Sequence, residues 1–148
     1  MEHDKIHGEP EELTASFSHA YELLIKWVQG GQPVTLLDGV RGPLRDLLLV
    51  RLMEGLERPL VVVVPKESEA EWVTESMVGL VSDEREVCHF PITDVSPYQS
   101  LPANRLLEAD RLRVLQALSG VHPPKITVLS ARALDLLTLP RAELKRAS

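Results

Sequence analysis

Cysteine and aromatic residues are scarce in this chain of 148 residues, which holds one cysteine, Cys88, and 4% aromatics. A single cysteine excludes an internal disulfide and a cysteine-based zinc site, and it is typical of a reducing compartment. No apolar run approaches the ~18 residues of a membrane span. The acidic residues 1–12 lack the basic and then apolar order of a signal peptide. We therefore expect a cytoplasmic protein that is not a secreted, membrane or metal-binding domain.

Positive charge is also in short supply, because 16 Lys and Arg face 22 Asp and Glu, for a net charge of -6. Residues 1–103 carry 8 basic and 18 acidic side chains, whereas residues 104–148 carry 8 basic and 4 acidic ones. This balance argues against duplex DNA binding by the chain alone. The basic C-terminal third could face an acidic partner or another part of a longer chain. Solvated helix faces with arginine near helix ends are the favoured alternative.

Hydrophobic residues make up 44% of the chain, which is enough for one folded domain. Strand-like and helical patterns alternate at short spacings, and this order predicts an α/β fold with an open parallel sheet and helices on both faces. We expect a flexible tail over residues 1–10 and a single domain over 11–148. The predicted strands are 34–37, 60–64, 87–90 and 126–129; the predicted helices are 11–29, 43–56, about 67–80, 104–119 and about 131–137, with Ser68 or Glu67 capping the third.

The turn after the first predicted strand has the place of a phosphate-binding loop. It contains Gly39 and Gly42, but a working loop needs Gly-Lys-Ser/Thr where this chain has Leu44, Arg45 and Asp46. A carboxylate at that helix start would compete with phosphate for the positive end of the dipole. We therefore interpret Gly39, Gly42 and Arg45 as a vestigial phosphate loop, with no cofactor, catalytic residue or metal ligand.

Other candidate sites are weaker. The pair His3 and His7 has a spacing that could bind metal but lies in the predicted tail, and His89 is expected to pack within a strand. No Ser/His/Asp arrangement and no acid/base pair of carboxylates stands out. The irregular stretch 91–103 is long for a compact domain, so we expect it to be functional or packed against another surface.

Several short motifs follow one another in an order that resembles a known family. The degenerate phosphate loop precedes an apolar strand, a strand ending in Phe-Pro, an acidic residue before Pro-Tyr, a helix with Arg-Leu, and a strand leading into Ser-x-x-x-Leu. Over about residues 30–140 this order resembles the N-terminal, UvrB-like region (domain 1a) of the bacterial transcription-repair coupling factor, Mfd. The family's Ser-Pro after the tyrosine is replaced here by Leu101-Pro102. The matching residues are 58–65, Phe90-Pro91, Asp94, Pro97-Tyr98, Arg111-Leu112 and 126–134.

The resemblance implies a P-loop or helicase-like fold whose nucleotide site is lost, and a non-catalytic scaffold and interaction role in transcription-coupled nucleotide excision repair. In the full-length family, which is a DNA translocase ATPase, the partners are UvrA and RNA polymerase. The family's UvrA-recruiting module follows the segment that matches residues 134–140, so we expect this domain to be incomplete. Two alternatives remain: a UvrB or helicase-class P-loop domain with residual ATP or DNA binding, and a free-standing α/β regulator.

Overall fold

The fold is given by a computed structural model, in which the described residues are 10–31, 33–56, 58–93 and 105–135. The chain divides into two compact units, Met1–Arg41 and Gly42–Ser148, and each is described by itself. The first unit contains helix α1 (Pro10–Gln29), as predicted. The helix ends where the N–H of Gly30 donates to the carbonyl of Lys26 and Gly31 takes a positive φ of 74°, a conformation that glycine adopts freely.

The strand predicted over residues 34–37 is wrong, because the structure gives this segment no strand. It lies in the first unit, whereas the sheet lies in the second, and the side chain of Leu36 is 91% exposed. A four-residue apolar run forms a strand only where a neighbouring strand pairs with it, since β propensity depends strongly on context. The four-stranded sheet expected from the sequence is therefore a three-stranded one in the described residues.

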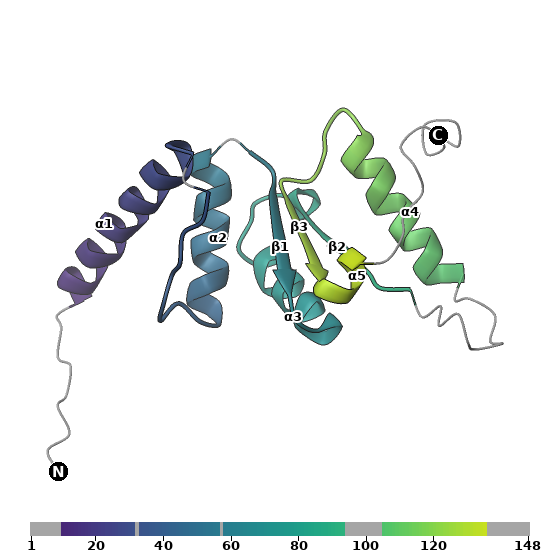
Figure 1. The fold of residues 1–148 in the computed structure, drawn as a ribbon, viewed down its shortest axis with the longest axis horizontal. Coiled ribbons are helices and arrows are strands. Elements are labelled where there is room, and N and C mark those ends of the chain that lie inside the picture. The colour runs from purple at the N-terminus through teal and green to yellow at the C-terminus, as the bar shows by residue number, and fades with distance from the viewer. Residues whose placement is uncertain (1–9, 32, 57, 94–104, 136–148) are drawn as a thin grey trace, which may run out of the picture. The chain divides into compact units, whose positions relative to one another are not determined.

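The second unit is an α/β fold around a small parallel sheet with the order β1-β3-β2 (Figure 1). Val128 of β3 lies opposite Val62 of β1 on one side and opposite His89 of β2 on the other. The central strand is therefore β3, the last of the three in the sequence. The other predicted strands and helices of this unit form close to their expected bounds. They are α2 (Pro43–Leu56), β1 (Leu60–Val64), α3 (Glu67–Val78), β2 (Val87–Phe90), α4 (Arg105–Ser119), β3 (Ile126–Ser130) and α5 (Ala131–Asp135). A short 3-10 helix, η1 (Glu84–Glu86), precedes β2 and was not predicted.

One face of the sheet packs against α3, and we call it the α3 face. Its buried side chains include Val64, Val87, Ile126 and Val128. Helix α3 meets them with Ala70, Val73 and Met77, whose spacing of three and four residues places them on one side of the helix. Helix α2 packs in turn against α3 and adds Val50 and Met53 to the same core. These side chains form one buried cluster, which is the main hydrophobic core of the unit.

The opposite face packs against α4 and α5, and we call it the α4 face. There Phe90 and Leu129 are buried together with Ala133 of α5, and Val114 and Leu115 of α4 pack against them. This core is smaller and covers β2 and β3. Helices thus lie on both faces of the described sheet, as the alternation of strands and helices predicts.

One local expectation about the helices is wrong. Neither Ser68 nor Glu67 caps α3; its N-cap is Lys66, which makes no side-chain capping hydrogen bond. In α4, the side chains of Leu106, Leu112 and Leu118 are solvent-exposed, whereas Arg111 is buried. No helix among the described residues combines the length and apolar character needed to cross a membrane.

Candidate functional site

The vestigial phosphate loop is divided between the two units. Gly39 lies in the first unit with a φ of 77°, and Gly42 begins the second with a φ of 55°. The carbonyl of Gly42 accepts from the N–H groups of Arg45 and Asp46, at 3.0 and 3.3 Å, and so starts α2. Pro43 has no N–H to offer. The first turn of α2 therefore has few free donors for an anion, although helix N-termini often bind one.

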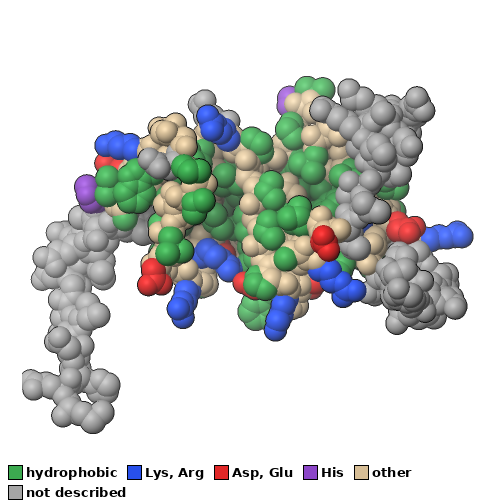
Figure 2. Space-filling model, viewed as in Figure 1, with side chains coloured by type: hydrophobic (Ala, Val, Ile, Leu, Met, Phe, Trp, Pro, Cys, Tyr) green, Lys and Arg blue, Asp and Glu red, His purple; other side chains and the backbone are tan. Residues whose placement is uncertain are grey.

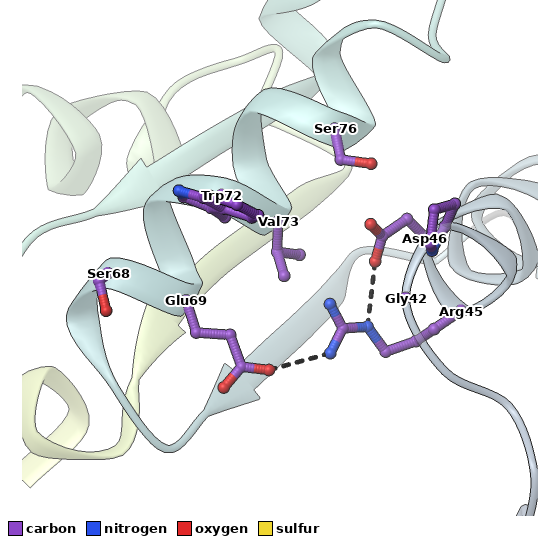
Figure 3. Close-up of a pocket in the computed structure, with 9 residues that line it drawn as sticks. Gly42, Arg45, Asp46, Ser68, Glu69, Trp72, Val73 and Ser76 are labelled. Carbon is purple, nitrogen blue, oxygen red and sulfur yellow. Dashed lines mark hydrogen bonds and ion pairs between the residues drawn. The ribbon is translucent and has the colours of Figure 1, made fainter.

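Arg45 turns toward two carboxylates of its own chain. Its Nε lies 3.0 Å from Oδ1 of the buried Asp46, and its Nη1 lies 3.1 Å from Oε1 of Glu69 in α3 (Figure 3). Partial burial opposes the charged form, but the hydrogen bonds to Asp46 and Glu69 outweigh it and raise the pKa of Arg45 above its ordinary value. The cation that the sequence places where a phosphate-binding lysine would stand is thus already neutralised.

A pocket of about 690 Å³ opens beside this ion pair, between the start of α2 and α3 (Figure 3). Trp72, which is 79% exposed, lines it together with Ser68 and Ser76. Asp46 and Glu69 supply its carboxylates and Arg45 its cation, so the pocket carries no surplus of positive charge. Such a lining does not favour a triphosphate, which binds where N–H donors and cations converge.

The motif residues behind the resemblance fall partly outside the described residues. Asp94, Pro97 and Tyr98 lie there, as do His3, His7 and the Leu101-Pro102 pair. Arg111 is described and is 6% exposed. Its Nη1 donates to the carbonyl of Pro91 at 2.7 Å, and its guanidinium lies 4.1 Å from the centroid of the Phe90 ring. The arginine of the Arg-Leu motif therefore binds the Phe-Pro motif directly.

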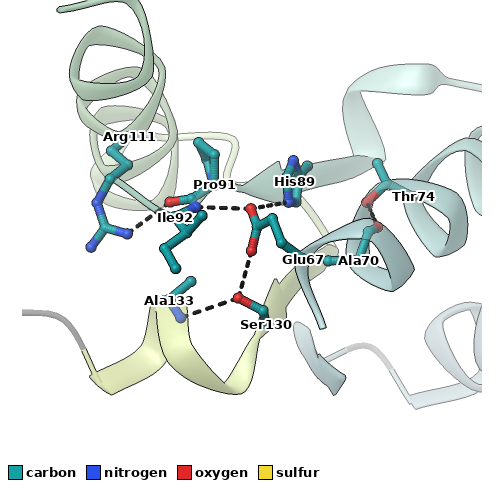
Figure 4. A network of polar contacts seen from close by, with 9 residues as sticks. All are labelled: Glu67, Ala70, Thr74, His89, Pro91, Ile92, Arg111, Ser130 and Ala133. Carbon is teal, nitrogen blue, oxygen red and sulfur yellow. Dashed lines mark hydrogen bonds and ion pairs between the residues drawn. The ribbon is translucent and has the colours of Figure 1, made fainter. Parts of the chain in front are cut away.

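Glu67 lies on the other side of the same backbone segment. One carboxylate oxygen, Oε1, accepts from the N–H of Ile92 at 2.8 Å (Figure 4). The other, Oε2, accepts from the hydroxyl of Ser130 at 2.5 Å. The carbonyl bound by Arg111 and the N–H bound by Glu67 belong to one peptide group, which joins Pro91 to Ile92. Burial lowers the pKa of Arg111, and the charge of Glu67 opposes that shift.

Ser130 and Glu67 connect the carboxyl ends of the strands. Ser130 ends β3, and its Oγ also accepts from the N–H of Ala133 at 3.2 Å, which is the capping geometry at the start of α5. Glu67 begins α3, where the helix dipole favours a carboxylate. Charge-assisted contacts thus link the segments that follow the three strands into one cluster, which we call the Glu67 cluster: Glu67, His89, Ile92, Arg111 and Ser130.

The Glu67 cluster contains a serine, a histidine and a carboxylate, but not in the order of a hydrolase triad. His89 Nε2 lies 3.1 Å from Oε1 of Glu67 without forming a hydrogen bond to it, so the two side chains make an ion pair only where the imidazole is protonated. Glu67 stands between Ser130 and His89, whereas in a Ser-His-acid triad the histidine stands between the serine and the acid. The hydrogen bonds that Glu67 accepts hold the Ile92 backbone and the Ser130 side chain in place.

The single cysteine lies in the sheet, one residue before His89. Its thiol donates to Oγ1 of Thr127 at 3.5 Å, and burial raises the pKa of Cys88 while this hydrogen bond lowers it by less. A raised pKa disfavours the reactive thiolate. Within the described ranges, no three His, Cys, Asp or Glu side chains form a group that could hold a metal ion.

Glu67 and Ser130 were not predicted as members of one cluster. A signal was available, because both follow predicted strands closely and the carboxyl ends of parallel strands meet at one edge of a sheet. The turn at Gly39 does not lie at that edge, because the segment before it, residues 34–37, forms no strand of the sheet. Arg111 was named for its motif, and its contacts explain why an arginine occupies the inner side of α4.

Comparison of the chain with protein-family models, with curated proteins and with solved structures finds no match.

Proposed function

We propose that this chain is a non-catalytic scaffold and interaction domain that acts in transcription-coupled nucleotide excision repair. We further infer that its three-stranded sheet is part of a P-loop or helicase-like fold of the UvrB domain 1a type, as the order of motifs in the sequence implies. The observation that best supports a non-catalytic role is that Arg45 forms ion pairs with Asp46 and Glu69. This arginine cannot reach a phosphate without leaving two carboxylates, one of them buried, without a cation.

The repair half of the proposal depends on the motif order, and the contact between two of its motifs supports it. Arg111 of the Arg-Leu motif hydrogen-bonds Pro91 of the Phe-Pro motif and stacks on Phe90. Bonds on both sides of the peptide after Pro91 fix the point from which the chain enters the stretch with Asp94, Pro97 and Tyr98. A fixed starting point favours recognition of the following segment by another protein, because less conformational entropy is lost on binding.

The competing proposal is a UvrB or helicase-class domain with residual ATP binding, and the pocket beside Arg45 is the place where it would act. Thermal unfolding of the full chain, followed with and without millimolar ATP and magnesium, separates the two. We expect no change in Tm. A saturable rise in Tm that Arg45→Ala removes would contradict the non-catalytic proposal, since a ligand that binds only the folded state stabilises it by mass action. Arg51→Ala is the matched control, because Arg51 pairs with Glu54 on an exposed helix face away from this pocket.

The interaction role is tested by immobilising the full chain and offering purified UvrA, UvrB and RNA polymerase separately. Retention of at least one of them, without nucleotide, is the expected result. Retention of none would contradict the role as a repair scaffold and favour the free-standing regulator.

A further inference from the structure

The pocket between α2 and α3 contains an aromatic side chain that is open to solvent. We call it the Trp72 pocket; its volume is about 690 Å³, and α3 lines it with Glu69, Trp72 and Ser76 among others (Figure 3). The side chain of Trp72 is 79% exposed, whereas tryptophan is normally buried over most of its surface. No described Lys or Arg forms a cation-π contact with its ring. The ring is therefore available to stack on a ligand.

Carboxylates accompany this ring along α3. The helix holds four glutamates and no Lys or Arg: Glu67, Glu69, Glu71 and Glu75. Glu69 and Glu75 stand three residues before and three residues after Trp72, a separation at which side chains on a helix are neighbours. Glu71 and Glu75 are exposed, and neither pairs with a cation among the described residues. The surface beside Trp72 is therefore acidic.

Arg45 shows that the Trp72 pocket already accommodates one guanidinium group. Its Nη1 lies 3.1 Å from Oε1 of Glu69, and its Nε lies 3.0 Å from Oδ1 of Asp46. The other oxygen of Glu69, Oε2, accepts no hydrogen bond from a described residue. One cation and two carboxylates also leave the lining with one surplus negative charge. A second cation that entered the pocket would thus find a free acceptor close to the aromatic ring.

The charges elsewhere on this unit give no comparable site for an anion. On the face of the second unit that Figure 2 shows, Lys and Arg side chains lie singly and form no patch that would attract an acidic partner. A cation is therefore the ligand that complements the Trp72 pocket. Among cations of proteins, a guanidinium fits best, because its planar group stacks on an aromatic ring while its N–H groups donate in the plane to a carboxylate. Trp and Arg are also enriched among the residues that contribute most to protein–protein binding.

We propose that the Trp72 pocket binds the side chain of an arginine in a basic segment of a partner protein. The guanidinium stacks on Trp72 and donates to Oε2 of Glu69, and the charge of Glu75 beside the pocket attracts the rest of the basic segment. This binding does not depend on the proposed repair role, and its failure would leave that role untouched.

The fluorescence of Trp72 tests this binding in the full chain. Trp27→Phe leaves Trp72 as the only tryptophan, so the signal reports on the pocket. The probe is a capped peptide Gly-Arg-Gly-Arg-Gly at ~150 mM salt, and the control peptides carry citrulline, which lacks the charge, or lysine in place of both arginines. We expect a saturable change with a midpoint below ~1 mM for the arginine peptide, binding at least about fivefold weaker for the lysine peptide, and no saturation with the citrulline peptide. No saturation with the arginine peptide, or equal binding of either control peptide, would overturn the proposal.

Substitutions separate this pocket from a general attraction between a basic peptide and an acidic chain. Glu69→Gln is expected to weaken binding of the arginine peptide about tenfold. Trp72→Ala, followed by calorimetry because the fluorescent ring is gone, is expected to weaken it about fivefold. Glu84→Gln, at an exposed position in η1 outside the pocket, removes the same charge as Glu69→Gln and is expected to leave the midpoint unchanged. Equal midpoints for Glu69→Gln and Glu84→Gln would contradict binding in the pocket.

A variant that binds more tightly guards against loss of binding through misfolding. Arg45→Gln removes the cation that competes for Glu69 and raises the surplus negative charge of the lining. We therefore expect the arginine peptide to bind at least about threefold more tightly to this variant. Unchanged or weaker binding by a cooperatively folded Arg45→Gln chain would overturn the proposal.

Discussion

Glu67 and Arg111 bind opposite ends of one peptide group. Glu67 accepts from the N–H of Ile92 at 2.8 Å, and Arg111 donates to the carbonyl of Pro91 at 2.7 Å, so an acid from α3 and a base from α4 hold the same backbone unit. Both contacts are long-range in sequence: Glu67 lies 25 residues from Ile92, and Arg111 lies 20 residues from Pro91. The exit of β2 is therefore fixed from both sides.

Removal of the carboxylate of Glu67 is expected to destabilise the fold. Glu67→Ala leaves the N–H of Ile92 and the hydroxyl of Ser130 without their acceptor, and we expect a loss of about 2 kcal/mol in the free energy of unfolding. Glu67→Gln keeps one acceptor oxygen and is expected to lose about half as much. Urea unfolding measures both. Glu71→Gln, on the exposed side of α3, is the control and should lie within ~0.5 kcal/mol of the unchanged chain. Equal stability of Glu67→Ala and the control would contradict the role of the Glu67 cluster.

A lysine cannot replace the arginine of the Arg-Leu motif without cost. Arg111→Lys retains the charge but loses the planar group that stacks on Phe90 while donating to Pro91, so we expect a loss of about 1–2 kcal/mol. The matched change is Arg113→Lys, two residues away, where the pair with Asp110 is exposed and worth ~0–1 kcal/mol at most. Chemical denaturation of both variants is the measurement. If Arg111→Lys were as stable as Arg113→Lys, the positive charge alone would be sufficient at position 111, which would contradict a role for the planar guanidinium.

The thiol of Cys88 gives a prediction about pH. Burial raises its pKa in the folded chain, so the folded state keeps the proton at pH values where the unfolded chain releases it. The resulting stabilisation is complete below the ordinary thiol pKa of about 8.5 and is lost as the pH rises through the folded value. We expect the alkylation rate to reach half its maximum at a higher pH in the native chain than in urea. In addition, the stability of the unchanged chain relative to Cys88→Ala should fall as the pH rises above that ordinary value. A native midpoint at or below the urea midpoint would refute this.

Duplex DNA is expected to bind the chain weakly or not at all. With a net charge of -6 and no described cluster of cations, few phosphate contacts can form, and those that do are lost as salt rises. Gel-shift titration at ~150 mM salt should show no complex at micromolar concentrations of the chain. A complex with micromolar affinity that weakens as salt increases would contradict the charge argument.

Most elements of the fold could be predicted from the sequence because their patterns are local. The run of valines in β1, the spacing of Ala70, Val73 and Met77, and Pro43 at the first position of α2 each specify an element within a few residues. The failures concern relations between elements. An apolar run at 34–37 carries no information on whether a neighbouring strand exists to pair with it.

The site was harder to predict than the fold for a related reason. The motif around Arg45 departs from a phosphate loop, but nothing in it points to Glu69, which lies 24 residues away in another helix. Arg111 interrupts an apolar stripe, and only the approach of β2 to α4 shows that its charge is used internally. Glu67 and Ser130 are ordinary polar residues at strand ends until the parallel sheet brings those ends together.

The measurement that tests the central claim most directly is strand-resolved removal of ultraviolet lesions from a transcribed gene. Cells that lack this chain are compared with cells that carry it and with deleted cells to which it is returned. The account predicts that without the chain the transcribed strand is repaired only as fast as the other strand, and that returning it restores the faster rate. Faster repair of the transcribed strand in the absence of the chain would contradict a role in transcription-coupled repair.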